Sequence, residues 1–148
     1  MARDPAVIPG LFYDDPNTAL EWLGKAFGFE LRLSYTDEAG RVGYAEVEVG
    51  DGVVAVRPAR GHSPHDLSPA AAGGVNTAHL TVTVPDVDRH CARAERAGAR
   101  VVEPLSDKFY GLRSYVAEDC AGHRWTFASP LSGPAPVEKR WQRDGKRG

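Results

Sequence analysis

The amino-acid sequence predicts an α+β fold in which two βαβββ modules in tandem form a curved mixed sheet around a cleft. The same order of strand and helix patterns occurs twice along the 148 residues, and turn-forming residues mark the same places in both copies. Asp15 and Asp86 stand where a strand gives way to a helix, and Gly28 and Gly98 end the two helices. A single module would bury its sheet poorly, so we expect the two modules to pack together.

The first module is expected over residues 1–58. An apolar strand, AVIPGLFY, precedes a helix that Asp15 or Asn17 can cap and whose first turn suits Pro16. Apolar side chains recur at helical spacing at Leu20, Leu23, Ala26 and Phe27. The strands FELRLSYT, RVGYAEVEV and VVAVRP follow, joined by the turns DEAG and GDG. Alternation in the middle strand turns one set of side chains away from the packed face: Tyr44, Glu46 and Glu48.

A segment rich in Gly, Ala, Pro, Ser and His, residues 59–76, is expected to link the modules. The second module, residues 77–129, repeats the order with the strand AHLTVTV, the helix PDVDRHCARAERAG and the strands ARVVEPL, LRSYVAED and RWTFAS. Residues 130–148 are expected to form a basic tail, and the four pieces to build one structural domain. In the helix, Cys91 belongs to the apolar stripe, whereas His90, beside arginines, is expected to face solvent.

Composition and charge exclude several classes of protein. The net charge of −2 and the pI near 6.2 give no general attraction for nucleic acid or for an acidic membrane, although the tail VEKRWQRDGKRG is locally basic. The sequence has neither an apolar run long enough to cross a membrane nor the pattern of a secretory signal, so we expect a cytoplasmic protein. Cys91 and Cys120 form no CxxC pair and predict neither a disulfide framework nor a zinc site.

Two stretches carry a resemblance to a known family. FYDDPNTALEWLGKAFGFE and FYGLRSYVAEDCAGHRWTFASP resemble the first strand and helix, and the closing hairpin, of the vicinal oxygen chelate superfamily of glyoxalases, bleomycin-resistance proteins and extradiol dioxygenases. The resemblance covers about residues 5–129, with Asp119-Cys120 where relatives often carry Asp-Pro, a departure expected to alter only the turn. It implies paired modules and a homodimer, but the fold hosts metalloenzymes and binding proteins alike.

The resemblance also implies four metal-ligand positions, one near the start of the first strand and one in the last strand of each module. His79 lies seven residues before Asp86, and the residue seven before Asp15 is Ile8. Counting four residues on from Gly52 and Gly122 completes the set, which is Ile8, Val56, His79 and Thr126. A shift of one residue would substitute Val7 or Pro9, Ala55 or Arg57, and Trp125 or Phe127. One histidine among such residues cannot hold an ion, so we expect no metal and no cofactor.

The cleft is then expected to hold an organic molecule of moderate size. The strand face that carries His79 also carries Thr81, and the first strand turns Phe12 to the same side. Tyr110 stands beside Gly111 on a loop, where it can close over a ligand. This mixture of aromatic and polar groups predicts a set of ligand-binding residues: Phe12, Tyr44, Glu46, His79, Thr81, Tyr110, Arg113 and Tyr115.

The leading functional hypothesis is metal-independent binding or sequestration of this small molecule, as in bleomycin-resistance proteins and antibiotic resistance, by a homodimer with no nucleic-acid or membrane partner. The first alternative is a glyoxalase-superfamily enzyme, a lyase, isomerase or dioxygenase, that uses an atypical metal site or the catalytic candidates His79 and Glu46 as an acid–base pair. The second alternative is a protein-interaction module that makes its contact through the basic tail.

Overall fold

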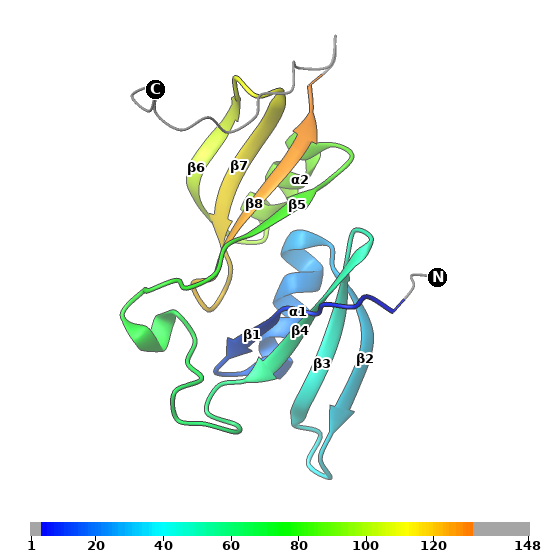
Figure 1. Cartoon of the computed structure of the whole chain (residues 1–148), viewed down its shortest axis with the longest axis vertical. Coiled ribbons are helices and arrows are strands. Elements are labelled where there is room, and N and C mark those ends of the chain that lie inside the picture. Colours follow the sequence, from blue (N-terminus) through cyan, green and yellow to red (C-terminus); the bar gives the residue numbers. More distant parts are fainter. Residues whose placement is uncertain (1–3, 132–148) are drawn as a thin grey trace, which may run out of the picture.

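The computed structural model describes residues 4–131, so most of the predicted basic tail lies outside the described residues. The first module consists of β1 (Gly10–Tyr13), α1 (Pro16–Phe27), β2 (Glu30–Thr36), β3 (Val42–Val49) and β4 (Gly52–Pro58) (Figure 1). Its strands form one sheet in the order β1-β4-β3-β2, in which β1 runs parallel to β4 and the other neighbours are antiparallel. No helix in the described part of the chain is long and apolar enough to cross a membrane.

The second module has the same topology. It consists of β5 (Leu80–Thr83), α2 (Val87–Arg96), β6 (Arg100–Asp107), β7 (Leu112–Glu118) and β8 (Arg124–Pro130), and its sheet order is β5-β8-β7-β6. One short 3-10 turn, η1 (Ala70–Ala72), lies in the linker between the modules. The structure confirms the α+β class and the tandem βαβββ order, with the eight strands divided into two four-stranded sheets. The strand AVIPGLFY is shorter than predicted and begins at Gly10.

Both helices begin where the sequence predicts a cap. The Asp15 carboxylate accepts hydrogen bonds from the backbone N–H and the hydroxyl of Thr18, and the hydroxyl contact lowers the pKa of Asp15. The Asp86 carboxylate accepts from the backbone N–H of Arg89 in the same way. Gly28 ends α1 in the left-handed conformation, with φ 77°. These caps fix the point in each module at which the chain leaves the sheet and enters the helix that covers the core.

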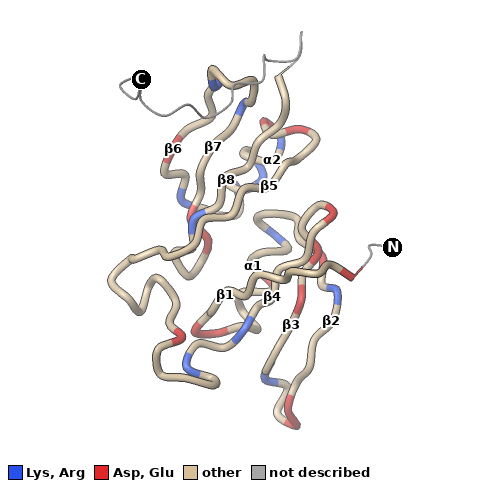
Figure 2. Tube along the Cα trace, viewed as in Figure 1, with Lys and Arg blue, Asp and Glu red and all other residues tan. Residues whose placement is uncertain are grey.

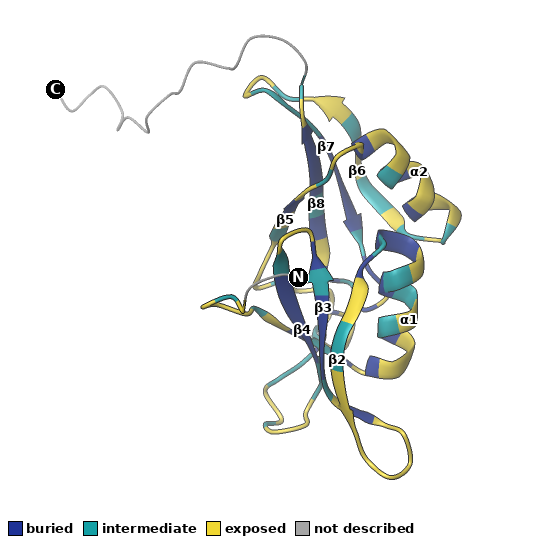
Figure 3. Ribbon diagram, turned by 90° about the vertical axis from the view of Figure 1, so that its right-hand side faces the viewer, coloured by how far each residue is buried: buried dark blue, intermediate teal, exposed yellow. Residues whose placement is uncertain are grey.

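The two helices cover the same side of the two sheets (Figure 3). An aromatic cluster joins the modules on this side, since the Phe27 ring lies 4.7 Å from Phe127 and the Phe29 ring 5.1 Å from Trp125, centroid to centroid. Both modules contribute to one continuous core of buried apolar side chains. The opposite side, which we call the outer face, is not covered by either helix. Strand alternation places on it five of the eight residues predicted to bind a ligand: Phe12, Tyr44, Glu46, His79 and Thr81.

A buried carboxylate also ties the modules together. Asp119, in the turn between β7 and β8, accepts hydrogen bonds from the Tyr13 hydroxyl at 2.7 Å and from the Trp125 indole N–H at 3.1 Å. Its other oxygen accepts from the backbone N–H groups of Ala121 and His123. The His123 ring in turn donates through Nε2 to the carbonyl of Phe12 in β1. Because Tyr13 and Phe12 belong to the first module, this turn locks the second module against it.

Candidate functional site

On the first sheet, the outer face carries Phe12 in β1 and Tyr44 and Glu46 in β3, with β4 between these two strands. Phe12 pairs with Arg57 in the β1–β4 ladder, and the Arg57 guanidinium carbon lies 5.7 Å from the centre of the Phe12 ring. The Tyr44 hydroxyl donates a hydrogen bond of 2.7 Å to Glu46, and this contact raises the pKa of Tyr44. Tyr44 and Glu46 therefore share one face of β3, as alternation predicts, and Phe12 lies on the same side of the sheet beside Arg57 of β4.

Glu46 is less accessible than the sequence indicates, and the Arg32 side chain lies beside its carboxylate. Glu46 is only 7% exposed, and its carboxylate lies 3.6 Å from Arg32 Nε. The same guanidinium pairs with Asp4, and its Nη1 is buried without a hydrogen-bond partner in the described residues. A carboxylate held in this way is an acceptor with fixed neighbours, not a free general base.

On the second sheet, the outer face carries His79, Thr81, Arg124 and Thr126. His79 Nε2 and Thr126 Oγ1 are hydrogen-bonded at 2.6 Å, and Thr81 pairs with Thr126 in the β5–β8 ladder. Arg124 donates to Glu118 across the β7–β8 ladder at 3.1 Å. One ring nitrogen of His79 is thus engaged with the Thr126 hydroxyl. Glu46 lies on the other sheet, where its carboxylate contacts Tyr44 and Arg32. The two candidate catalytic residues therefore have separate partners.

The residues at the four implied ligand positions do not fit a metal ion. His79 and Ile8 occupy equivalent places before β5 and β1. The predicted equivalence of Val56 with Thr126 is wrong, because Thr126 pairs with Thr81 as Ala55 pairs with Gly10, and Val56 is buried in the core. Isoleucine and alanine offer no lone pair. No group of three or more metal-ligating side chains occurs within residues 4–131.

Two of the predicted ligand-binding residues lie on the helix side of the sheet instead of the outer face. Tyr115 is completely buried in the core, where its hydroxyl contacts His90 of α2 at 2.6 Å. Arg113, on the same face of β7, forms ion pairs with Asp88 of α2 and with Asp107. The prediction that these two side chains line the cleft is therefore wrong. Polar groups are tolerated on the helix side of β7 because α2 supplies their hydrogen-bond and ion-pair partners.

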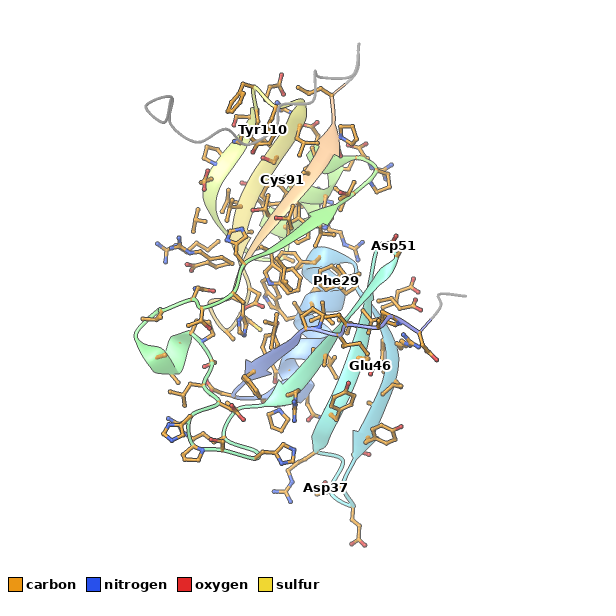
Figure 4. All side chains as sticks on the ribbon, viewed as in Figure 1. Phe29, Asp37, Glu46, Asp51, Cys91 and Tyr110 are labelled. Carbon is orange, nitrogen blue, oxygen red and sulfur yellow. The ribbon has the colours of Figure 1, made fainter. Side chains whose placement is uncertain are left out.

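Tyr110 is exposed in the loop between β6 and β7, next to Phe109, at the end of the second module far from Glu46 (Figure 4). The two rings pack edge to face, with centroids 5.2 Å apart. The structure therefore separates Tyr110 from the residues of the first sheet with which the sequence grouped it.

The prediction that His90 faces solvent is wrong, because its ring lies between α2 and the end of α1. Its Nε2–H donates to the Phe27 carbonyl at 3.0 Å, so in the neutral ring Nδ1 accepts from the Tyr115 hydroxyl. The residue is half-buried rather than solvated, and burial lowers its pKa. The helical spacing in the sequence could have indicated this burial, since His90 lies three residues after Val87 and four before Ala94, and both are buried.

Two cavities lie where the modules meet. The junction cavity, of about 560 Å³, lies between residues 5–9, the β3–β4 turn and β5, and its walls include Val7, Val53, Thr81 and Trp125. The helix-side cavity, of about 540 Å³, lies between the end of α1, the same β3–β4 turn and α2. Among the eight predicted ligand-binding residues, Thr81 lines one of these cavities. Both volumes lie in the range of small-molecule sites, which is roughly 300–1,000 Å³.

Comparisons with known proteins agree with this architecture. The uncharacterized protein Mb0911c of Mycobacterium bovis is 32% identical over 131 residues, which cover 86% of this chain and 85% of the relative. The crystal structure of TioX from Micromonospora sp. ML1 has a TM-score of 0.68 and 37% sequence identity, and the match covers 88% of this chain and all of TioX.

More distant structures share the fold. TnmS3, described as an antibiotic binding protein from Streptomyces sp. CB03234, has a TM-score of 0.62 at 20% identity, with 88% of this chain and 98% of TnmS3 covered. The family model of the Glyoxalase/Bleomycin resistance protein/Dioxygenase superfamily matches residues 6–127. With its two βαβββ modules, its outer sheet faces and this match over most of its length, the chain belongs to the Glyoxalase/Bleomycin resistance protein/Dioxygenase superfamily.

Proposed function

We propose that this protein binds and sequesters an organic molecule of moderate size on its outer face without a metal ion. The observation that carries the proposal is the composition of that face: rings and hydroxyls at Phe12, Tyr44 and Thr81, and no set of metal-ligating side chains among the described residues. Aromatic rings supply a large contact area to a flat apolar ligand, and a few hydroxyls and charged groups orient it.

The rigidity of the aromatic surface supports a binding role. The Arg57 guanidinium holds one side of Phe12, and Glu46 accepts from the Tyr44 hydroxyl. Side chains already fixed in one rotamer lose little entropy when a ligand binds. The antibiotic-binding description of TnmS3, a protein of the same fold, supports a ligand of this kind for the present chain.

We also propose that two chains pair in the cytoplasm so that the outer face of one covers that of the other. In one chain this face is a surface, and burying most of a drug-sized ligand requires a second wall. Val7 and Ile8, before β1, are exposed apolar side chains beside it, with Val7 79% exposed. Sedimentation of the full chain should therefore give a dimer, and a monomer at all concentrations would contradict the pairing.

The test of ligand binding uses a panel of aromatic antibiotics that includes metal-free bleomycin, with tryptophan fluorescence and equilibrium dialysis as readouts. For any compound that binds, Phe12→Ala should weaken affinity by about tenfold or more, because a stacked aromatic ring is lost. Phe109→Ala is the matched control, since it removes the same side chain from the exposed β6–β7 loop. Equal effects of the two substitutions would contradict binding at the outer face.

Replacing His79 by Ala distinguishes binding from the enzyme alternative. In a binding protein the substitution removes one hydrogen bond to Thr126 and should change ligand affinity by only a few fold. In an enzyme that uses His79 for proton transfer, the same substitution should abolish turnover. The separate partners of His79 and Glu46 favour the first outcome.

A further inference from the structure

We propose that the helix-side cavity is a second binding site, distinct from the outer face, for a small organic carboxylate with an apolar body. The cavity has a volume of about 540 Å³ and opens between the modules on the side of the helices, whereas the outer face lies on the opposite side of the sheets. The inference goes beyond the proposed function, because it concerns different residues and a different class of ligand.

The inner wall of this cavity is apolar and aromatic. Phe27 and Phe29, at the end of α1, are buried core residues that also face the cavity, and Val82 and Val84 line it from β5 and the residue after it. The Phe29 ring lies between the two modules (Figure 4). The two ring nitrogens of His90 are already engaged with Phe27 and Tyr115, so His90 contributes ring surface to this wall and no free donor. A wall of this kind suits the apolar body of a ligand.

The rim of the cavity is basic. Arg89, Arg93 and Arg96 line it from successive turns of one face of α2, and the carboxylates that line it are Glu48 and Asp86. Figure 2 shows the basic positions of α2 in the second module, above the end of α1. Within residues 4–131, neither Arg89 nor Arg96 forms an ion pair, and the Asp86 carboxylate already accepts the Arg89 backbone N–H. Three guanidinium groups against two carboxylates favour an anionic ligand.

Arg93 gives the rim a fixed point. Its Nε donates to the Lys25 carbonyl at 3.0 Å and its Nη2 to the Gly24 carbonyl at 2.9 Å, so the guanidinium closes the end of α1. Arg89 and Arg96 lie before and after Arg93 along α2. Their guanidinium groups can each bind a ligand carboxylate through two parallel hydrogen bonds, the geometry that arginine prefers. An apolar body against Phe27 and Phe29 and a carboxylate at the arginines would satisfy both parts of the cavity.

The test compares two probes of similar shape, the anionic 2-naphthoate and the neutral 2-naphthamide, titrated into the full chain at low salt and followed by backbone amide NMR. We expect naphthoate to bind about tenfold or more tightly than naphthamide, with shifts concentrated at Gly28, Thr83 and Ala92 around the cavity. Equal affinities, or shifts confined to the outer face around Phe12 and Thr126, would overturn the proposal.

Paired substitutions provide the control. Arg89→Gln with Arg96→Gln should abolish the preference for naphthoate, because both free guanidinium groups are removed. Arg41→Gln with Arg60→Gln makes the same change in net charge at exposed positions outside the cavity, and should preserve the preference. Loss of the preference in both pairs would show a general charge effect and overturn the site. Because neither pair alters Phe12 or His79, this result does not depend on whether the outer face binds a ligand.

Discussion

The two modules use the turn between their last two strands in opposite ways. In the first module, the β3–β4 turn at Gly50 and Asp51 is exposed and lines both cavities. In the second module, the β7–β8 turn contains Asp119, which is 6% exposed and accepts four hydrogen bonds, one of them from the first module. Equivalent places in a repeat therefore serve different purposes: one turn holds the modules together, and the other borders the spaces between them.

The difference follows from the length and composition of the two turns. Val49 pairs directly with Gly52, so the first turn has two residues and no side chain that points inward. Glu118 pairs with Arg124, so five residues form the second turn and bring Asp119 under Tyr13 and Trp125. Burial and the nearby Asp119 carboxylate raise the pKa of Tyr13 well above its ordinary value, which keeps its hydroxyl a donor to that carboxylate.

The largest expected effect is that of removing the buried carboxylate. Asp119→Ala leaves the Tyr13 hydroxyl and the Trp125 N–H buried without their acceptor and should lower the free energy of unfolding by about 3 kcal/mol or more. Asp51→Ala in the exposed turn should change it by less than about 0.5 kcal/mol. Urea unfolding followed by tryptophan fluorescence measures both values.

If Asp119→Ala does not fold, Tyr13→Phe still tests the contact between the modules. It removes one donor to Asp119 and should lower the free energy of unfolding by about 1–2 kcal/mol. Similar small losses for Asp119→Ala and Asp51→Ala would show that the two turns do not differ as described.

An intermediate effect is expected at the helix ends. Gly28 and Gly98 both have positive φ, 77° and 93°, so alanine is strained at either position. A Cβ at Gly28 would also lie 2.8 Å from Arg93 Nη1, whereas one at Gly98 would have no atom within 4 Å beyond those of the adjacent residues. Gly28→Ala should therefore lower the free energy of unfolding by about 1–2 kcal/mol, and Gly98→Ala by about 1 kcal/mol. Thermal unfolding measures this difference.

The double substitution Gly28→Ala with Arg93→Ala separates the two causes. Since Arg93→Ala removes the crowding atom, Gly28→Ala should destabilise that background no more than Gly98→Ala destabilises the parent chain. An unchanged difference would mean that the contact between α2 and the end of α1 does not distinguish the two glycines.

The smallest expected effect is a pH dependence at His90. Burial holds the pKa of His90 below that of the unfolded chain, so the unfolded state binds more protons in acid. The stability linked to His90 is complete above the unfolded pKa of about 6.5 and is lost as the pH falls from there toward the lowered folded pKa. His90→Gln should flatten the melting temperature between about pH 5 and 7, while His65→Gln in the exposed linker should not. Identical profiles in the two variants would contradict a role for His90.

The periodic features of the fold were predictable from the sequence because they depend on local patterns. The caps at Asp15 and Asp86 and the outward direction of Tyr44 follow from residue types and alternation. The predicted equivalence of Val56 with Thr126 is wrong by one residue. It was counted from Gly52 and Gly122, which occupy different places in turns of different length. Counting from landmarks therefore predicts elements better than single side chains.

Contacts between distant segments were not predictable from the sequence. Tyr13 and Asp119 are 106 residues apart in the sequence, and no local pattern links them. Tyr115 lies in a strand that is buried on both faces, so alternation indicated that it shares a face with Arg113 but not which face that was. The two cavities likewise depend on how the modules meet, which periodicity does not specify.

The central claim, ligand binding without a metal ion, is tested most directly by elemental analysis of the protein purified without chelators, combined with ligand titration before and after EDTA. The side chains at the four ligand positions predict far less than one divalent ion per chain and the same dissociation constant in both titrations. A divalent ion bound at one per chain, with binding or activity that disappears on chelation and returns when the ion is restored, would contradict the account.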